Sequence, residues 1–339
     1  MVAVVAKVMA VVFAVALIST GVATTATAAP APRAEGALNA GLSGPGPYAV
    51  SATAQVTRCV GPEADAQNAD ARRQGAFTPL QCTSAAPIGR GPDTGVDFYY
   101  PTATGQRPLV VFVPGSRANP GYFAPLARHW ASYGFVVAIS YKGTELAPES
   151  GFLGLRRAVA VNGDRTSPLF GRMDLRRVVL AGHSSGATKA IEVAGIANAT
   201  NGVPVPPAFD VPAAVRLVGV LALAPDVYTV PTPVRTPTLI ATGTADRASN
   251  PGRIEPIVYG PITGAPAWFV VARGAPHLGV VNPLTTYPLT GVAVQFLRFV
   301  TGDPAACRSF VGPSWTLPGD GAFARVVRNA TARASSCPA

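Results

Sequence analysis

The sequence predicts an α/β domain with a mostly parallel central sheet and helices on both of its faces. From residue 107 onward, short apolar runs alternate with longer stretches that have helical periodicity. Parallel strands joined by crossover helices give this alternation, because helices then cover both faces of the sheet. A second observation is the pentapeptide GHSSG at residues 182–186, which separates one apolar run from one helical stretch. This is the order of a strand–turn–helix unit.

Six apolar runs are interpreted as strands, and four stretches with helical patterns are interpreted as helices. The predicted strands cover residues 109–114, 135–141, 177–182, 217–224, 237–243 and 267–272. The predicted helices cover residues 122–133, 151–161, 185–197 and 289–300.

The N-terminus has the order of charged, apolar and small residues that is typical of a secretory signal peptide. Lys7 precedes the apolar run VMAVVFAVALI, and alanine-rich sequence follows it. This run is shorter than the roughly 20 residues that span a bilayer, so a cleaved signal is favoured over a membrane anchor. The predicted organisation is a signal peptide over residues 1–28, a flexible leader over 29–46 and a single domain over 47–339. The mature protein is expected to be secreted, without stable membrane insertion.

Four cysteines follow the predicted signal: Cys59, Cys82, Cys307 and Cys337. An even number of cysteines in an exported protein indicates disulfides. Their order favours the local pairs Cys59–Cys82 and Cys307–Cys337, although the sequence leaves other connectivities open. The polar segment between the first two cysteines is interpreted as an excursion closed by a disulfide. With three histidines and no Cys-x-x-Cys pair, neither a metal site nor a cofactor is expected.

The formal net charge of +10 arises from 27 basic and 17 acidic residues. The basic residues form no run interleaved with aromatic side chains, so nucleic acid is not an expected partner. In a chain rich in alanine and proline, a genomic composition bias explains the arginine enrichment as easily as a binding adaptation does. The charge therefore points to no specific partner.

The pentapeptide GHSSG places Ser184 on the turn between a predicted strand and a predicted helix. A serine on so tight a turn needs neighbours without side chains, so that its hydroxyl stands exposed at the carboxyl edge of the sheet. The competing interpretation is a chance meeting of small residues, since the chain contains 35 glycines. The strand–turn–helix context favours a nucleophile, which requires a base to take its proton.

Three histidines are the candidates for this base. His129 lies in a predicted helix as an ordinary packing residue, and the side chain of His183, next to the serine, is expected to point away. His277 follows the last predicted strand and is the predicted base. A carboxylate must orient such a histidine and stabilise its charged form. Asp246, just after the fifth predicted strand, is the predicted partner, and Asp226, one strand earlier, is the alternative.

Two backbone N–H groups are expected to bind the oxygen on which negative charge develops during acyl transfer. One should come from Ser185, directly after the nucleophile, and the other from Ser116, in the loop after the first predicted strand.

These segments resemble the cutinase-like polyester hydrolases, a secreted bacterial branch of the α/β-hydrolase fold that includes PET-degrading enzymes. The resemblance rests on the motifs GPYAV, VDFYYPT, VVFVPGS, YGFVVAISY, GHSSG, TPTLIATGTAD, GAPHLGVV and FLRFVTGDPAACRSF, which occur in the family's order. It implies the α/β-hydrolase fold, a triad of Ser184, Asp246 and His277, and a disulfide that pins the C-terminal tail. Some motifs recur in chlorophyllase-like and platelet-activating-factor-acetylhydrolase-like relatives, so a lipid esterase is an alternative.

Three positions depart from the family's pattern. Ser116 stands where an aromatic residue usually follows Pro-Gly, and Ser185 stands where a methionine usually follows the nucleophile. The tryptophan that the family carries after the sixth strand of its own fold is missing here. Tyr228, in the corresponding segment, becomes the candidate substrate contact, with Trp268 and Tyr287 as further aromatic candidates. All three departures remove apolar surface from the expected cleft.

The sequence therefore predicts a secreted serine carboxylic-ester hydrolase that forms an acyl-enzyme. Its expected partner is an ester substrate, short-chain or small, with polyesters as a further class. An exported hydrolase-fold protein that binds without catalysis is the alternative from another class, and the altered cleft motivates it.

Overall fold

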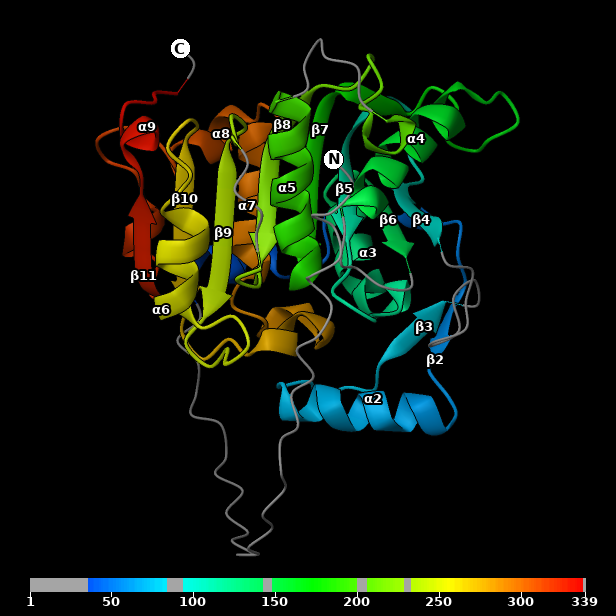
Figure 1. The fold of residues 1–339 in the computed structure, drawn as a ribbon, viewed down its shortest axis with the longest axis horizontal. Helices are drawn as coiled ribbons and strands as arrows, with labels where there is room; N and C mark the ends of the chain where they lie inside the picture. Colours follow the sequence, from blue (N-terminus) through cyan, green and yellow to red (C-terminus); the bar gives the residue numbers. More distant parts are fainter. Residues whose placement is uncertain (1–35, 84–93, 143–147, 200–205, 229–232, 338–339) are drawn as a thin grey trace, which may run out of the picture. The chain divides into compact units, whose positions relative to one another are not determined.

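The computed structural model describes residues 36–83, 94–142, 148–199, 206–228 and 233–337. Its strands are β1 (Val50–Ala52), β2 (Val56–Arg58), β3 (Gln81–Thr83), β4 (Thr94–Pro101), β5 (Arg107–Val113), β6 (Val136–Lys142), β7 (Met173–His183), β8 (Leu217–Leu223), β9 (Thr238–Gly243), β10 (Ala267–Ala272) and β11 (Phe323–Arg328). Within the described residues, nine strands form one sheet in the order β1-β4-β6-β5-β7-β8-β9-β10-β11, and β2 pairs with β3 (Figure 1). Neighbouring strands from β6 to β10 in this order are parallel, and β1, β4 and β11 add antiparallel pairings at the two sides.

Helices cover both faces of this sheet. They are α1 (Ala37–Leu42), α2 (Pro62–Arg73), α3 (Ala124–Ser132), α4 (Glu149–Gly163), α5 (Ser185–Ala199), α6 (Pro251–Ile254), α7 (Thr290–Val300), α8 (Pro304–Cys307) and α9 (Ala330–Arg333). Side chains of α3 and α7 pack in one core cluster, and those of α4, α5 and α6 pack in a second (Figure 1). This architecture confirms the predicted fold class.

Alternate residues of the inner strands contribute to the two clusters. On β5, Val110 and Phe112 belong to the cluster with α3 and α7, whereas Leu109 and Val111 belong to the cluster with α4 and α5. Successive side chains of a strand point to opposite faces, so a strand covered on both faces is apolar at every position. This is why the predicted strands are continuous apolar runs in the sequence.

The carboxyl ends of the parallel strands lie at one edge of the sheet, because these strands share a direction. The loops that follow them carry the residues singled out in the sequence: Ser116 after β5, Ser184 after β7, Asp226 after β8, Asp246 after β9 and His277 after β10. Ligands of open α/β sheets bind at this edge.

All six predicted strands are present, and the structure adds elements that apolar periodicity does not reveal. The outer strand β11 has exposed residues at Ala324 and Arg325, as suits a strand at the side of a sheet. Helix α2 lies in the polar excursion and buries only two alanines and Asn68, so it carries no apolar stripe. Both elements are therefore hidden from a search for apolar runs.

The predicted flexible leader over residues 29–46 is wrong for its last part. Residues 36–46 contain α1, which packs against α7. The buried side chain of Asn39 accepts the N–H of Gly291 at 2.9 Å, and Leu38 N–H donates to Asp320 at 2.9 Å. The ordered domain thus begins before the predicted boundary at residue 47. Buried amide contacts from a segment rich in alanine and glycine are not visible in its composition.

Both predicted disulfides are present. Cys59–Cys82 closes the excursion that contains α2, and Cys307–Cys337 joins α8 to the segment after α9. The predicted signal peptide, residues 1–28, lies outside the described residues. In the part of the chain that the structure describes, no helix has the length and apolar character needed to cross a membrane.

Candidate active site

Ser184 lies between β7 and α5 with a left-handed backbone conformation, φ 56°. This conformation costs about 1–3 kcal/mol for a residue with a side chain. A Cβ on Gly182 would lie 2.3 Å from the carbonyl oxygen of Gly186, and a Cβ on Gly186 would lie 2.1 Å from that of Val113. The two glycines are therefore required because β7, α5 and β5 approach each other through their backbones.

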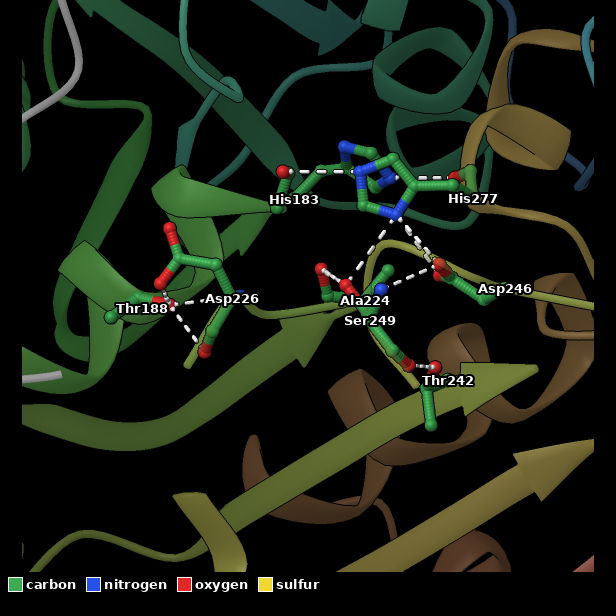
Figure 2. Close-up of polar contacts among 9 residues, drawn as sticks. His183, Thr188, Ala224, Asp226, Thr242, Asp246, Ser249 and His277 are labelled. Atoms are coloured by element: carbon green, nitrogen blue, oxygen red, sulfur yellow. Dashed lines mark hydrogen bonds and ion pairs between the residues drawn. The ribbon is translucent and has the colours of Figure 1, made fainter. Parts of the chain in front are cut away.

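A chain of hydrogen-bonding distances joins Ser184, His277 and Asp246. His277 Nε2 lies 3.1 Å from Ser184 Oγ. His277 Nδ1 lies 3.1 Å and 3.0 Å from the two carboxylate oxygens of Asp246 (Figure 2). A carboxylate only accepts, so Nδ1 donates and Nε2 is left to accept from the serine hydroxyl. His277 and Asp246 are 7% and 3% exposed, so water screens their interaction little.

Ser249, a residue that the sequence interpretation misses, holds this arrangement in place. Its N–H donates to Asp246 Oδ1 at 2.7 Å, and its hydroxyl donates to the carbonyl of Ala224 at 2.6 Å (Figure 2). Thr242 Oγ1 in turn donates to the Ser249 carbonyl at 2.6 Å. An aspartate side chain favours local bonds to nearby backbone N–H groups, which is the signal that could have identified this turn.

The alternative carboxylate, Asp226, interacts with α5 instead. Thr188 Oγ1 and Tyr228 N–H both donate to Asp226 Oδ1, each at 2.9 Å. Figure 2 shows Asp226 and Thr188 together, apart from His277. Of the two candidate acids, the structure brings Asp246 to the histidine.

The expectation that the His183 side chain points away from the site is wrong. His183 Nε2 donates to the backbone carbonyl of His277 at 2.8 Å, and the two rings lie 4.7 Å apart. Burial, followed by the nearby imidazole of His277, lowers the pKa of His183 to about 3. A neutral, buried imidazole thus supports the backbone that carries His277. His129 lies on α3 with its Nε2 2.9 Å from the carbonyl of Leu42, as suits a packing residue.

The two predicted N–H donors for the oxyanion lie together, but one is already engaged. Ser116 N–H donates to Ser185 Oγ at 2.7 Å. Ser185 is the first residue of α5, and N–H groups in a first helical turn have no acceptor within the helix. Ser185 therefore brings an acceptor of its own to the loop after β5. The sequence does not predict this contact, because it depends on the orientation of one hydroxyl.

A cavity of about 550 Å³ opens beside Ser184 and His277. The loop after β5, with Ser116 and Arg117, lines one side, and α2 lines another. Within the described ranges, no group of three or more His, Cys, Asp or Glu side chains could hold a metal ion.

The aromatic residues considered as substrate contacts lie elsewhere. Tyr228 is 79% exposed and does not line the cavity beside Ser184, and Trp268 and Tyr287 are buried in the core. Among the described residues, the aromatic side chains in the cavity wall are Tyr122 and Phe123.

The strained turn after β7 occupies the place where the α/β-hydrolase class carries its nucleophile, and the sheet has that class's architecture. The chain belongs to the PET hydrolase-like family. The model of this family matches residues 52–316, which is more than half of the chain. None of the curated proteins matches it. Membership of this family indicates an ester or polyester hydrolase of the α/β-hydrolase type.

Replacement of His183 should change how stability depends on pH. Its folded pKa of about 3 lies below the ordinary histidine pKa of 6.5, so between these values the unfolded chain binds a proton that the folded chain does not. The free energy of unfolding therefore falls as pH is lowered through this window, by up to about 1.4 kcal/mol per pH unit. His183→Gln keeps a donor for the His277 carbonyl but does not titrate, so its urea-unfolding free energy should fall less steeply from pH 6 to pH 4. Equal slopes for the two proteins would contradict a neutral, buried His183.

Proposed function

We propose that the protein is a secreted carboxylic-ester hydrolase that forms an acyl-enzyme on Ser184. The observation that carries this proposal is the unbroken chain of hydrogen-bonding distances from Ser184 Oγ through His277 to Asp246. A serine hydroxyl is a weak nucleophile until a base is positioned to take its proton. Here the base lies at hydrogen-bond distance, and the backbone at Ser184 turns the hydroxyl toward the cavity wall.

In the first half of the reaction, Ser184 Oγ attacks the ester carbonyl carbon while His277 Nε2 takes the hydroxyl proton. Asp246 stabilises the imidazolium that forms and keeps its Nδ1–H in place. The tetrahedral intermediate then breaks its bond to the alcohol oxygen, and His277 returns the proton to that oxygen. In the second half, water attacks the acyl carbon while His277 Nε2 takes its proton. The bond from that carbon to Ser184 Oγ then breaks, and His277 returns the proton to Oγ, which releases the acid product.

The oxyanion of each intermediate is proposed to bind the N–H groups of Ser185 and Ser116. The Ser116 N–H is held by the neutral hydroxyl of Ser185 before reaction. An oxyanion is a stronger acceptor than a hydroxyl, because charge-assisted hydrogen bonds are roughly twice as strong as neutral ones. The developing charge can therefore draw this N–H away from Ser185 or share it.

Secretion is supported by the two disulfides, which persist in oxidising compartments, and by the order of residues at the N-terminus. The proposed partner is the ester substrate itself.

The preferred substrates are proposed to be short-chain or small esters rather than long or aryl polyester segments. Serines stand at positions 116 and 185, and no described aromatic side chain extends the cavity beyond Tyr122 and Phe123. Loss of about 60 Å² of apolar contact weakens binding by about 1.5 kcal/mol, or roughly tenfold.

The role of Asp246 can be separated from that of Asp226 by matched substitutions. Asp246→Asn should lower kcat for p-nitrophenyl butyrate by roughly 10³- to 10⁴-fold, because the histidine loses its orienting carboxylate. Asp226→Asn changes a carboxylate that binds Thr188 and should retain the wild-type kcat. Ser184→Ala gives the residual rate without a nucleophile. Equal effects of the two asparagine variants would contradict the assignment, as would wild-type turnover by the alanine variant.

The size preference predicts the order of kcat/KM in a chain-length series. Acetate and butyrate esters should be hydrolysed faster than octanoate and palmitate esters, and release of aromatic acid from an amorphous polyester film should be slow. A preference for octanoate over acetate of more than about tenfold, the size of one aromatic contact, would contradict this proposal. Rapid hydrolysis of the film would do the same.

A further inference from the structure

Helix α2 forms one wall of the cavity beside Ser184. The residues of this helix and its C-cap that line the cavity follow helical spacing, so a single face is turned toward the candidate nucleophile: Glu63, Ala66, Gln67, Asp70, Ala71 and Gln74. Figure 1 shows α2 beyond the edge of the sheet toward which the arrow of β9 points. The loop after β5 lines the same cavity, with Ser116 and Arg117. A substrate at Ser184 therefore lies in a cavity that both this loop and the helix line.

The end of this wall is hydrogen-bonded to the loop after β10, which carries the candidate base. Leu278 N–H donates to the carbonyl of Gln74 at 2.9 Å. Asn282 Nδ2 donates to the carbonyl of Gly75 at 2.8 Å, and Asn282 Oδ1 accepts the N–H of Phe77 at 2.7 Å. The wall and the base are thus parts of one connected structure.

Further contacts fix the rest of the excursion. The Tyr122 hydroxyl donates to Gln67, which ties the middle of α2 to the segment before α3. The buried side chain of Asn68 accepts the N–H of Leu80 at 2.8 Å, and the Cys59–Cys82 disulfide closes the base of the loop. These contacts hold α2 in place, so the same side chains of the helix lie next to the substrate.

The cavity face of this wall is polar. Four of its six lining residues carry a carboxylate or an amide: Glu63, Gln67, Asp70 and Gln74. Asp70 forms an ion pair with Arg73 and accepts a hydrogen bond from Gln74, the C-cap of the same helix. Glu63 makes no ion pair within the described structure. Arg117, which also lines the cavity, balances one negative charge. The cavity therefore offers many hydrogen-bonding groups and little net charge.

We propose that α2 is a specificity element. It selects esters that carry hydroxyl groups on the part of the molecule that lies against this helix, such as partial esters of a polyol. The inference rests on the proposed function, since it concerns substrates of the same nucleophile. An alkyl or aryl group against this wall strips water from carboxylates and amides without replacing their hydrogen bonds. Hydroxyl groups replace those bonds, and the small net charge favours a neutral polar group over an ion.

Two pairs of isosteric esters test this selection. Glycerol 1-monobutyrate and 2-methylbutyl butyrate differ only in the alcohol part, and methyl 3,4-dihydroxybutanoate and methyl 3-methylpentanoate differ only in the acyl part. We expect the wild-type protein to hydrolyse the hydroxyl-bearing ester with the higher kcat/KM in at least one pair. A preference for the alkyl ester in both pairs would overturn the inference.

Substitutions on the two faces of α2 assign the preference to the helix. Glu63→Leu/Asp70→Leu makes the cavity face apolar and should lower the hydroxyl-to-alkyl ratio of kcat/KM by about tenfold, the effect of one charge-assisted hydrogen bond. The control Asp65→Leu/Arg72→Leu changes two exposed charged residues of the same helix that do not line the cavity, and should keep the wild-type ratio. Glu63→Leu alone disturbs no described hydrogen bond, so it provides a second variant if the double variant unfolds.

The outcomes separate this inference from the proposed function. Unchanged ratios in the cavity-face variants, with ester turnover intact, would overturn the selection by α2 and leave the esterase assignment standing. An equal fall in the control variant would also overturn it, because the effect would then not depend on the cavity face. Failure of the wild-type protein to hydrolyse any of the four esters would overturn the proposed function and this inference with it.

Discussion

The close backbone contact of α5 with β5 and β7 determines where every other part of the site must lie. No Cβ fits at Gly182 or Gly186, and this contact holds Ser184 at φ 56°. The serine hydroxyl and the first N–H of α5 are thereby fixed relative to the sheet. Parallel strands then deliver the loops with Asp246 and His277 to the same edge, so the remaining groups need only loops of the right length.

The loop that carries His277 is held by groups outside the chain of hydrogen bonds to the serine. His183 binds the carbonyl of His277, and Gln74 accepts the N–H of the next residue, Leu278. The Ser249 N–H donates to the carboxylate of Asp246. A general base works best when its ring is held at one distance from the nucleophile, and these contacts restrict that distance. Gln74 is also the C-cap of α2. The hydrogen bond from Leu278 to Gln74 therefore connects the polar cavity face of α2 directly to the loop that carries the base.

Much of the fold and of the candidate site could be predicted because their signals are local. Strands buried on both faces are apolar throughout, and a chain with three histidines leaves few candidates beside Ser184. The rest depends on contacts between distant segments. The hydroxyl of Ser185 on the Ser116 N–H, the ring of His183 and the polar helix α2 follow from side-chain orientation and packing, which spacing does not encode. The segment around Asn39 was hidden for the same reason, since its burial depends on α7.

The central claim is that Ser184 is an activated nucleophile, and covalent labelling tests it most directly. The purified protein is treated with a fluorophosphonate, digested and mapped by mass spectrometry. The account predicts one adduct, on the peptide that contains Ser184, which disappears in Ser184→Ala but persists in Ser185→Ala. Absence of an adduct on the folded wild-type protein would contradict the account and favour a binding protein without catalysis. An adduct on a serine other than Ser184 would contradict it as well.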